Sequence, residues 1–312
     1  MSDPDVTTVV VNWNTVGLLD ECLASILAAT PPGVANDVVV VDNGSTDGSL
    51  EHLAAAWPHV RVLANPENVG FCRANNRAIR ATRSPYLLLV NTDARLPVGG
   101  IDALLRYFEE DDRAAVVGPR LVYGDGAFQR WTAGRLPAAG SMAVYLFGLD
   151  RVGPRALRRR GLYLGADTRQ PFRPAWVSSA VMAVRRAALD EIGLLDERIF
   201  VYMDDVDLCA RAGAAGWHVW YAADVTATHF MGSSSRRATG RASPEALRAL
   251  NRWYVRRHGR AAGLALRATE LAGFTARAVL HGVAALGGRP GSRSQAAAHA
   301  THLRLALERI DA

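Results

Sequence analysis

The sequence predicts an α/β fold, with a mostly parallel central sheet covered by helices on both faces and followed by a helical C-terminal region. Three observations predict it. Short β-rich apolar runs alternate with helical stretches through the first half of the chain. Some of these runs, such as 38–41 and 87–90, are apolar throughout, which is typical of strands buried on both faces. Past Gly232 the composition shifts to Ala and Arg with helical patterns, and we expect a domain boundary there.

The elements of the first half follow from this alternation, because each apolar run of strand length is followed by a stretch of helical pattern. In chain order we predict strand 7–11, helix 18–29, strand 38–41, helix 50–57, strand 60–63, helix 71–80, strand 86–90, helix 101–110 and strand 115–117. Such an order is typical of nucleotide-binding α/β architectures.

The second half begins with a segment, 124–174, in which Gly, Pro and Arg accumulate and regular periodicity is lost. We predict a loop-rich segment there, and one of that length is usually functional or mobile. Regular structure is expected to return in this order: 176–184, helix 187–192, an acidic helix from Asp204, short strands near 219 and 227, helices 244–257, 264–286 and 296–310, the last two joined by a linker over 288–294.

Composition indicates a globular protein, since 49% of the 312 residues are hydrophobic and 21% are charged. The net charge of +6 and the pI near 9.6 favour an anionic partner, although charge alone does not separate nucleic acid, phospholipid and phosphorylated small molecules. Arginines gather in 151–160 and 236–260, where a solvated basic face is an equal alternative to a binding patch.

Three cysteines without paired spacing, Cys22, Cys72 and Cys209, argue against a disulfide framework or a thiolate metal site and favour a reducing cytoplasm. The first eight residues carry acids where a signal peptide would carry basic residues. No charge-free apolar run reaches the roughly 18 residues that span a bilayer. We therefore expect a soluble or peripheral cytoplasmic protein.

The most informative motif places three carboxylates, Asp204, Asp205 and Asp207, at the start of one predicted helix. Clustered carboxylates disfavour one another's ionisation, so a helix N-terminus, a divalent cation or a nearby arginine must offset their charge. The simpler alternative is that the three acids complement the helix dipole and that Asp207 pairs with Arg211 one turn on.

Polar residues also follow three predicted strands, where ligands of open α/β sheets bind. Asp42 follows the second strand and could accept hydrogen bonds from a base or ribose, although such a turn is more often a simple connection to a helix. The helix after the third strand offers backbone N–H groups and Arg73 to a diphosphate, or is simply a capped helix with a surface arginine. Asn91 and Asp93 end the fourth strand two positions apart and could address one hard cation.

Taken together, these motifs resemble those of the inverting nucleotide-sugar glycosyltransferases of family 2, and more narrowly of its bacterial rhamnosyltransferase-like branch. The likeness covers about 7–235 and rests on five motifs in the right order: Asn12-Trp13-Asn14, 41–47, 68–71, Asn91-Thr92-Asp93 and 204–209. It implies a GT-A fold, a Rossmann-like arrangement in which 1–235 is the catalytic domain. The nucleotide-binding half would cover about 1–120 and the acceptor half about 121–235, with a basic Ala- and Arg-rich helical extension over 236–312.

The resemblance also implies roles for individual residues. Asp205 matches the catalytic base, Asp93 would ligate a divalent cation, Mg²⁺ or Mn²⁺, and His229 sits where many relatives place a histidine near metal and phosphates. A lone histidine is usually structural, but Gly232 and 233–235 follow it as in relatives. The implied donor-sugar and acceptor pocket is Asn91, Trp176, Ser178, Ser179 and Asp204. The implied nucleotide-binding residues are Val11, Asn12, Asn14, Asp42, Asn43, Asn68, Gly70, Arg73 and Thr92.

Two positions depart from the family pattern. Asn91 replaces the first acid of the Asp-x-Asp signature, which puts metal affinity in doubt. Asp204 stands where a glutamate usually precedes the base, which puts the acceptor in doubt. The chemistry itself requires a carboxylate that takes the acceptor proton and a cation that stabilises the departing diphosphate. We expect placement at a helix start to help keep Asp205 ionised, which a base requires.

The expected function is transfer of a sugar, with L-rhamnose on dTDP as the first candidate, from a dTDP- or UDP-linked donor to a glycan or lipid-linked acceptor of cell-surface polysaccharide. A nucleotidyltransferase on a similar fold and a non-catalytic nucleotide-sugar-binding protein are the alternatives, and no nucleic-acid partner is expected. The apolar, Ala-rich stretch 264–286 is interrupted by Arg267, Glu270, Arg277 and His281 at spacings compatible with one helical face. It predicts either an in-plane amphipathic helix at the inner face of the membrane or a helix packed on the catalytic domain or in a homodimer.

Overall fold

A computed structural model describes residues 3–154, 157, 160–230 and 243–308. The chain divides into two compact units, which we call the sheet unit, 1–133 with 167–237, and the helical unit, 134–166 with 238–312. The predicted boundary at residue 235 falls between the described ranges. The structure groups 134–166 with the C-terminal helices, and the predicted functional split at 235 stays a prediction.

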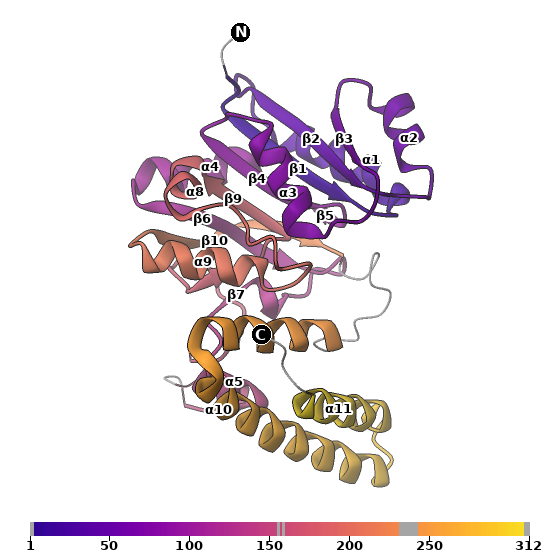
Figure 1. Cartoon of the computed structure of the whole chain (residues 1–312), viewed down its shortest axis with the longest axis vertical. Helices are drawn as coiled ribbons and strands as arrows, with labels where there is room; N and C mark the ends of the chain where they lie inside the picture. Colours follow the sequence, from indigo (N-terminus) through magenta and orange to yellow (C-terminus); the bar gives the residue numbers. More distant parts are fainter. Residues whose placement is uncertain (1–2, 155–156, 158–159, 231–242, 309–312) are drawn as a thin grey trace. The chain divides into compact units, whose positions relative to one another are not determined.

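The sheet unit contains one eight-stranded sheet in the order β3-β2-β1-β4-β9-β6-β10-β5 (Figure 1). Six strands are parallel, whereas β9 runs antiparallel to β4 and β6, and β5 runs antiparallel to β10. The predicted, mostly parallel sheet is thus confirmed. The strands are β1 (Val6–Asn12), β2 (Asn36–Asn43), β3 (Arg61–Asn65), β4 (Tyr86–Asn91), β5 (Ala94–Arg95), β6 (Ala114–Val122), β9 (Val181–Arg185) and β10 (His218–His229).

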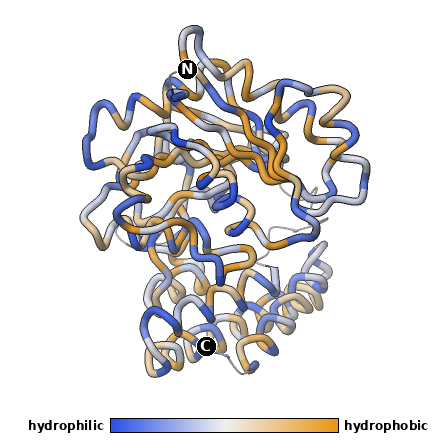
Figure 2. Tube along the Cα trace, turned by 45° about the horizontal axis from the view of Figure 1, so that its top comes forward, coloured by the Kyte–Doolittle hydropathy of each residue, from blue (hydrophilic) through white to orange (hydrophobic). Residues whose placement is uncertain are grey.

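Helices cover this sheet because their apolar faces need a surface to bury against. The helices α1, α2 and α4 share one core cluster with alternate residues of β1 and β2, while α3 packs on the same two strands outside that cluster. Figure 2 shows the strands as the most hydrophobic part of this unit. The helices of the sheet unit are α1 (Val16–Ala29), α2 (Ser49–Ala56), α3 (Phe71–Arg80), α4 (Gly100–Glu110), α8 (Arg186–Ile192) and α9 (Asp204–Ala214).

Three predicted elements differ in the structure. The run 176–184 is broken into β8 (Trp176–Val177) and β9, so that 178–180 lie between strands. The two strands near 219 and 227 are one long strand, β10, whose register against β6 shifts between Ala222 and Thr226. The predicted loop-rich segment contains a 3₁₀ turn (Arg130–Thr132), β7 (Ala133–Gly134), α5 (Ala139–Leu146) and α6 (Leu149–Val152). These elements are too short to show a period in the sequence.

The helical unit is built on α5, α10 (Pro244–Leu286) and α11 (Ser292–Leu307). The hydroxyl of Ser243 caps α10 by accepting from the backbone N–H of Ala246, and Pro244 occupies the first helical position. Gly259 kinks the helix, since its φ of 82° lies in the left-handed region that glycine favours. The two helices predicted at 244–257 and 264–286 are therefore present within α10, joined at the kink at Gly259.

Further along the helical unit, α11 begins at Ser292 rather than at 296, and the predicted end at 310 lies outside the described residues. None of the helices within the described ranges combines the length and the apolar character that crossing a bilayer requires.

Candidate active site

The predicted nucleotide-binding residues gather at the carboxyl edge of three adjacent parallel strands. The register pairs Asn12 at the end of β1 with Asp42 on β2, and Val11 with Asn91 at the end of β4. The hydroxyl of Thr15, just after β1, donates to the side-chain oxygen of Asn12 at 2.6 Å and lies 3.0 Å from the hydroxyl of Thr92, from which it can accept. The edge predicted from the sequence is thus assembled.

Asp42 is fully buried, and protein groups already donate to both of its carboxylate oxygens. The side-chain amide of Asn12 donates to Oδ1 at 2.8 Å, and the backbone N–H of Ser45 donates to Oδ2 at 3.0 Å. The side-chain oxygen of Asn14, a residue with a left-handed φ of 54°, accepts from the backbone N–H of Thr46 at 2.8 Å. Asp42 therefore fixes the loop after β2, and its predicted contact with a nucleoside stays a prediction.

Two asparagines fix the loop that enters α3. The side chain of Asn43 donates to Asn68 at 2.8 Å and accepts from the side chain of Asn65 at 2.9 Å. The side-chain oxygen of Asn68 in turn accepts from the backbone N–H of Gly70 at 3.0 Å. Both predicted nucleotide-binding asparagines therefore hold backbone in place.

The start of α3 does not offer its first amide to a diphosphate. The N–H of Phe71 donates to the carbonyl oxygen of Phe200 at 2.7 Å. A Cβ at Gly70 would lie 2.8 Å from the ring of Phe200 and 3.0 Å from that carbonyl. Arg73 is largely exposed and lies 4.0 Å from Glu197. The segment before α9 thus packs against Gly70, and the predicted contact of this helix start with a diphosphate stays a prediction.

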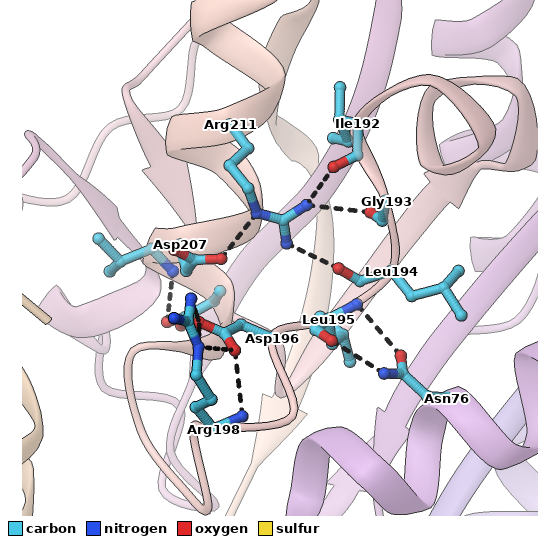
Figure 3. Close-up of polar contacts among 11 residues, drawn as sticks. Asn76, Ile192, Gly193, Leu194, Leu195, Asp196, Arg198, Asp207 and Arg211 are labelled. Atoms are coloured by element: carbon cyan, nitrogen blue, oxygen red, sulfur yellow. Dashed lines mark hydrogen bonds and ion pairs between the residues drawn. The ribbon is translucent and has the colours of Figure 1, made fainter. Parts of the chain in front are cut away.

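The acidic start of α9 is braced by Arg211, as Figure 3 shows. Its guanidinium donates to Asp207 at 2.8 Å and to the carbonyl oxygens of Ile192, Gly193 and Leu194 at 2.8–3.0 Å. The predicted pairing of Asp207 with Arg211 is therefore present. It neutralises one of the three carboxylates and leaves Asp204 and Asp205 as the uncompensated pair.

Asp204 and Asp205 enter α9 from two residues in left-handed conformations, Tyr202 with φ 63° and Met203 with φ 69°. The Oδ1 atom of Asp205 accepts from the N–H of Val206 at 2.8 Å, and Oδ2 accepts from the N–H of Ser179 at 3.4 Å. Asp204 is 5% exposed, and its Oδ2 has no hydrogen-bond partner within the described part of the chain.

Burial raises the pKa of Asp205 well above the ordinary carboxylate range, and the neighbouring charge of Asp204 raises it further. Burial raises the pKa of Asp204 as well, against a hydrogen bond from Ser179 that lowers it. The backbone N–H groups of the helix start lower the pKa of Asp205, as expected, but they do not decide its net shift. Desolvation of two adjacent carboxyls outweighs the helix dipole and the two backbone donors.

The two predicted metal ligands lie side by side at the far end of β4. Nε2 of His229 is 3.2 Å from Oδ1 of Asp93, and both side chains are largely buried. Nδ1 of His229 lies 3.1 Å from the amide oxygen of Gln129. The amide nitrogen of Gln129 donates to the carbonyl oxygens of Val122 and His229. That orientation makes Nδ1 the donor, so the Nε2 lone pair of a neutral imidazole faces the carboxylate.

Two acceptors facing each other at this distance fit either an imidazolium or a shared cation. The residues therefore fit a divalent ion with two protein ligands, Asp93 and His229. Among the described residues no cluster of three or more His, Cys, Asp or Glu side chains could hold a metal alone. A site with two protein ligands suits Mg²⁺, which usually binds through one or two protein ligands together with substrate phosphates and water.

Asp93 and Asp205, more than a hundred residues apart, are tied to the same pair of strands. The N–H of Asn91 donates to the carbonyl oxygen of Ala180 at 2.9 Å, and the preceding Ser179 donates to Asp205. On its other side, the carbonyl oxygen of Asp93 accepts from Phe230 at 2.8 Å. The β4 and β9 edge therefore brings the predicted base and the predicted metal ligand into one neighbourhood.

The remaining predicted pocket residues differ in their access. Ser178 and Ser179 lie in the break between β8 and β9, beside Asp205. Trp176 is only 3% exposed, so it packs in the interior of the fold. Gly232 and 233–235, cited in support of His229, lie outside the described residues.

The sequence did not single out three residues that position the site: Gln129, which orients His229, Phe200, which seats against Gly70, and Asn76. The side chain of Asn76 donates to the carbonyl oxygen of Leu195 at 2.8 Å and accepts from its N–H at 3.1 Å, as Figure 3 shows. Each of these residues contacts a partner about a hundred or more positions away in the sequence. No local sequence pattern marks such a contact.

Solved structures with a similar fold include the mannosyltransferase PcManGT from Pyrobaculum calidifontis with GDP-Man and Mn²⁺. It has a TM-score of 0.60 at 19% identity, covering 98% of this chain and 86% of that one. GalNAc-T7 with UDP, GalNAc and Mn²⁺ has a TM-score of 0.57 at 14% identity, covering 80% of this chain and 47% of that one. Both likenesses concern the fold.

Sequence comparison is more specific. The N-acetylglucosaminyl-diphospho-decaprenol L-rhamnosyltransferase of Mycobacterium tuberculosis is 31% identical over 250 residues, which cover 75% of this chain and 78% of that protein. The family model of glycosyl transferase family 2 matches residues 7–193, which include the three strand ends, the start of α3 and the β9 edge. This protein belongs to glycosyl transferase family 2.

Proposed function

We propose that this glycosyltransferase moves L-rhamnose from dTDP-L-rhamnose to N-acetylglucosamine carried on a polyprenyl diphosphate. The observation that carries the proposal is the 31% identity, over three quarters of the chain, to a relative whose name states that sugar and that acceptor. The product would serve cell-wall polysaccharide synthesis. The three described cysteines are free and buried, which suits a reducing cytoplasm, and we place the reaction at the inner face of the membrane.

The proposed chemistry is a single displacement with inversion. The acceptor hydroxyl attacks the anomeric carbon, its proton passes to a carboxylate oxygen of Asp205, and the bond to the diphosphate breaks on the opposite face. Ser179 supports Asp205 in this role by donating its backbone N–H to Oδ2. The raised pKa suits proton capture, since a more basic carboxylate holds the proton better once it has taken it.

The divalent ion would be held by Asp93 and His229 and would stabilise the charge of the departing diphosphate. Gln129 keeps Nε2 of His229 turned toward Asp93, which is the orientation that a ligand needs. Asn12, Asp42 and Asn43 shape the loops at which the nucleoside would bind, through the hydrogen bonds described above.

The test is a transfer assay with the full chain, a short-chain polyprenyl-diphospho-N-acetylglucosamine acceptor, and a panel of donors. The panel contains dTDP-L-rhamnose, UDP-N-acetylglucosamine, UDP-glucose and GDP-mannose, each with Mg²⁺, Mn²⁺ or EDTA. We expect a product only with dTDP-L-rhamnose and a loss of turnover in EDTA, and the anomeric configuration follows from NMR of the product.

Turnover with a different donor would overturn the sugar assignment and keep the reaction class. Full activity in EDTA would remove the metal. Binding of donors without any turnover would favour a non-catalytic nucleotide-sugar-binding protein, and pyrophosphate release from a nucleoside triphosphate would favour a nucleotidyltransferase.

A further inference from the structure

The second half of α10, from Ala261 to Leu286, exposes no charged residue. Among its exposed positions Thr275 is the only polar one, and the rest are apolar. The larger of these are Leu264, Val279, Leu280, Val283 and Leu286, whose side chains are 60–90% exposed. At about 1.5 Å per residue this stretch is close to 40 Å long. We call its exposed residues the apolar face of α10.

The charged side chains of the same stretch form hydrogen bonds within the helical unit. Glu270 is fully buried and accepts from the side-chain amide of Asn251 at 3.0 Å. Arg267 donates to the carbonyl oxygen of Glu308, and Arg277 donates to the carbonyl oxygen of Leu146 at 2.6 Å. A helix that faced only water would show the opposite arrangement, with its charges outside and its apolar residues inside.

The charge of the helical unit indicates what covers this face. That unit contains 18 arginines and five acidic residues, a net charge of +13, whereas the sheet unit contains 18 arginines and 25 acidic residues, a net charge of −7. Exposed arginines lie at both ends of the apolar face, Arg257 and Arg260 before it and Arg289 and Arg293 after it. Two copies of so positive a unit repel each other, while an anionic surface attracts it.

We propose that the apolar face of α10 lies in the plane of an anionic lipid bilayer, with its side chains among the acyl chains near the headgroups. The arginines at its two ends contact the lipid phosphates. The surface follows from α10 alone. Through the proposed function it also gains a purpose, because a lipid-linked acceptor is met at such a bilayer.

The test is flotation of the full chain with vesicles of phosphatidylcholine alone or mixed with phosphatidylglycerol. We expect binding to the mixed vesicles, weaker binding to the neutral ones, and partial release at 0.5 M salt. A triple variant, Leu280→Gln, Val283→Gln and Leu286→Gln, is expected to lose at least tenfold in the vesicle partition coefficient. The double variant Arg289→Gln, Arg293→Gln is expected to lose the preference for the anionic vesicles.

The matched control is Val98→Gln, which changes an exposed apolar residue of the sheet unit that is 85% exposed, and it should float like the wild type. Circular dichroism checks that all variants are folded. The proposal is overturned if the wild type does not float with anionic vesicles, or if the triple variant floats equally well. A dimer in light scattering that the triple variant loses, without any flotation, would assign the face to a second copy.

Failure of the proposed function is read out separately. Transfer to a water-soluble acceptor should be the same in the triple variant and the wild type, because α10 contributes no predicted site residue. Absence of turnover in both would count against the sugar transfer and leave the flotation result intact.

Discussion

Two helices of this protein turn carboxylates inward, and they surround them differently. On α9 the acids lie in the first turn, where backbone N–H groups point at them and Arg211 neutralises Asp207. On α10 the single buried acid, Glu270, lies in mid-helix and has one amide donor. The acids of α9 face the strand edge where the predicted site residues gather. On α10 the acid points inward, and the apolar face of the helix therefore has no charged residue. In the proposed function the same costly burial serves proton transfer in the sheet unit, whereas in the helical unit it leaves an outer surface without charge.

The largest effect expected from this contrast is that of Asp205→Asn. The amide keeps the size of the side chain and cannot take the acceptor proton, so transfer should fall by about 10³-fold while donor binding persists. Steady-state transfer and calorimetric donor titration measure the two quantities. The control is Asp102→Asn, an exposed acid in the first turn of α4. Equal losses in both variants would contradict the role given to Asp205.

The next effect is on stability. Arg211→Met removes the partner of Asp207 and the donor to three carbonyl oxygens, so the free energy of unfolding should fall by about 3–4 kcal/mol. Urea denaturation measures it. The exposed arginine of a neighbouring ion pair provides the control, since Arg198→Met should cost less than about 1 kcal/mol. A loss no larger than the control's would mean that α9 holds its acids without this brace.

Glu270 tests the other side of the comparison through pH. Burial raises its pKa from 4.5 to about 7, against the Asn251 hydrogen bond and the charge of Arg267, which lower it. Between those values the folded chain holds a proton that the unfolded chain has released, so stability is greatest below pH 4.5 and falls as pH rises to 7. The loss amounts to at most about 3 kcal/mol.

Glu270→Gln removes this dependence, because the amide stays neutral at every pH. The variant should gain up to about 3 kcal/mol over the wild type at pH 8 and nothing near pH 4.5, measured by urea denaturation at both. Glu245→Gln, an exposed acid at the start of the same helix, should change stability by only a few tenths of a kcal/mol at either pH. Greater stability of the wild type at pH 8 would mean that Glu270 is stabilised as an anion.

The smallest expected effect is a shift in the pH dependence of sugar transfer. The pKa of Asp205 is raised by burial and by Asp204, so transfer should increase with pH through the range where the pair loses its proton, and below it should fall tenfold per unit. Asp204→Asn removes one of the two causes, so the acidic limb of kcat/KM should move to lower pH. A limb that stays in place would show that burial alone sets it.

The structure also shows which elements could be predicted from local sequence patterns and which could not. The runs of valine and leucine predicted the strands at 38–41 and 86–90 within two residues of β2 and β4. The strand order could not be predicted, because β9 inserts antiparallel between β4 and β6 through pairings that no turn signal announces. The helix at 139–146 was missed because it is too short to show a helical period in the sequence. Its eight residues bury their apolar side chains only once α10 is present beside it.

The candidate site divides in the same way. Asp42, Asp93 and Asp205 could be found because each ends a strand or begins a helix. The position of Phe200 against Gly70 depends on a missing Cβ, and the role of Gln129 depends on two carbonyl groups meeting its amide. The net rise in the pKa of Asp205 could not be predicted, because the depth at which a helix start lies is a tertiary property. Burial, and no local motif, decides it.

The modest overall charge of this chain conceals a strong electrical asymmetry between its two units. A negatively charged surface attracts the helical unit and repels the sheet unit, so it favours encounters through the unit that contains α10. Each part feels this field over roughly a nanometre at 0.1 M salt. At the proposed bilayer contact, this field biases the orientation of the chain before the two surfaces touch.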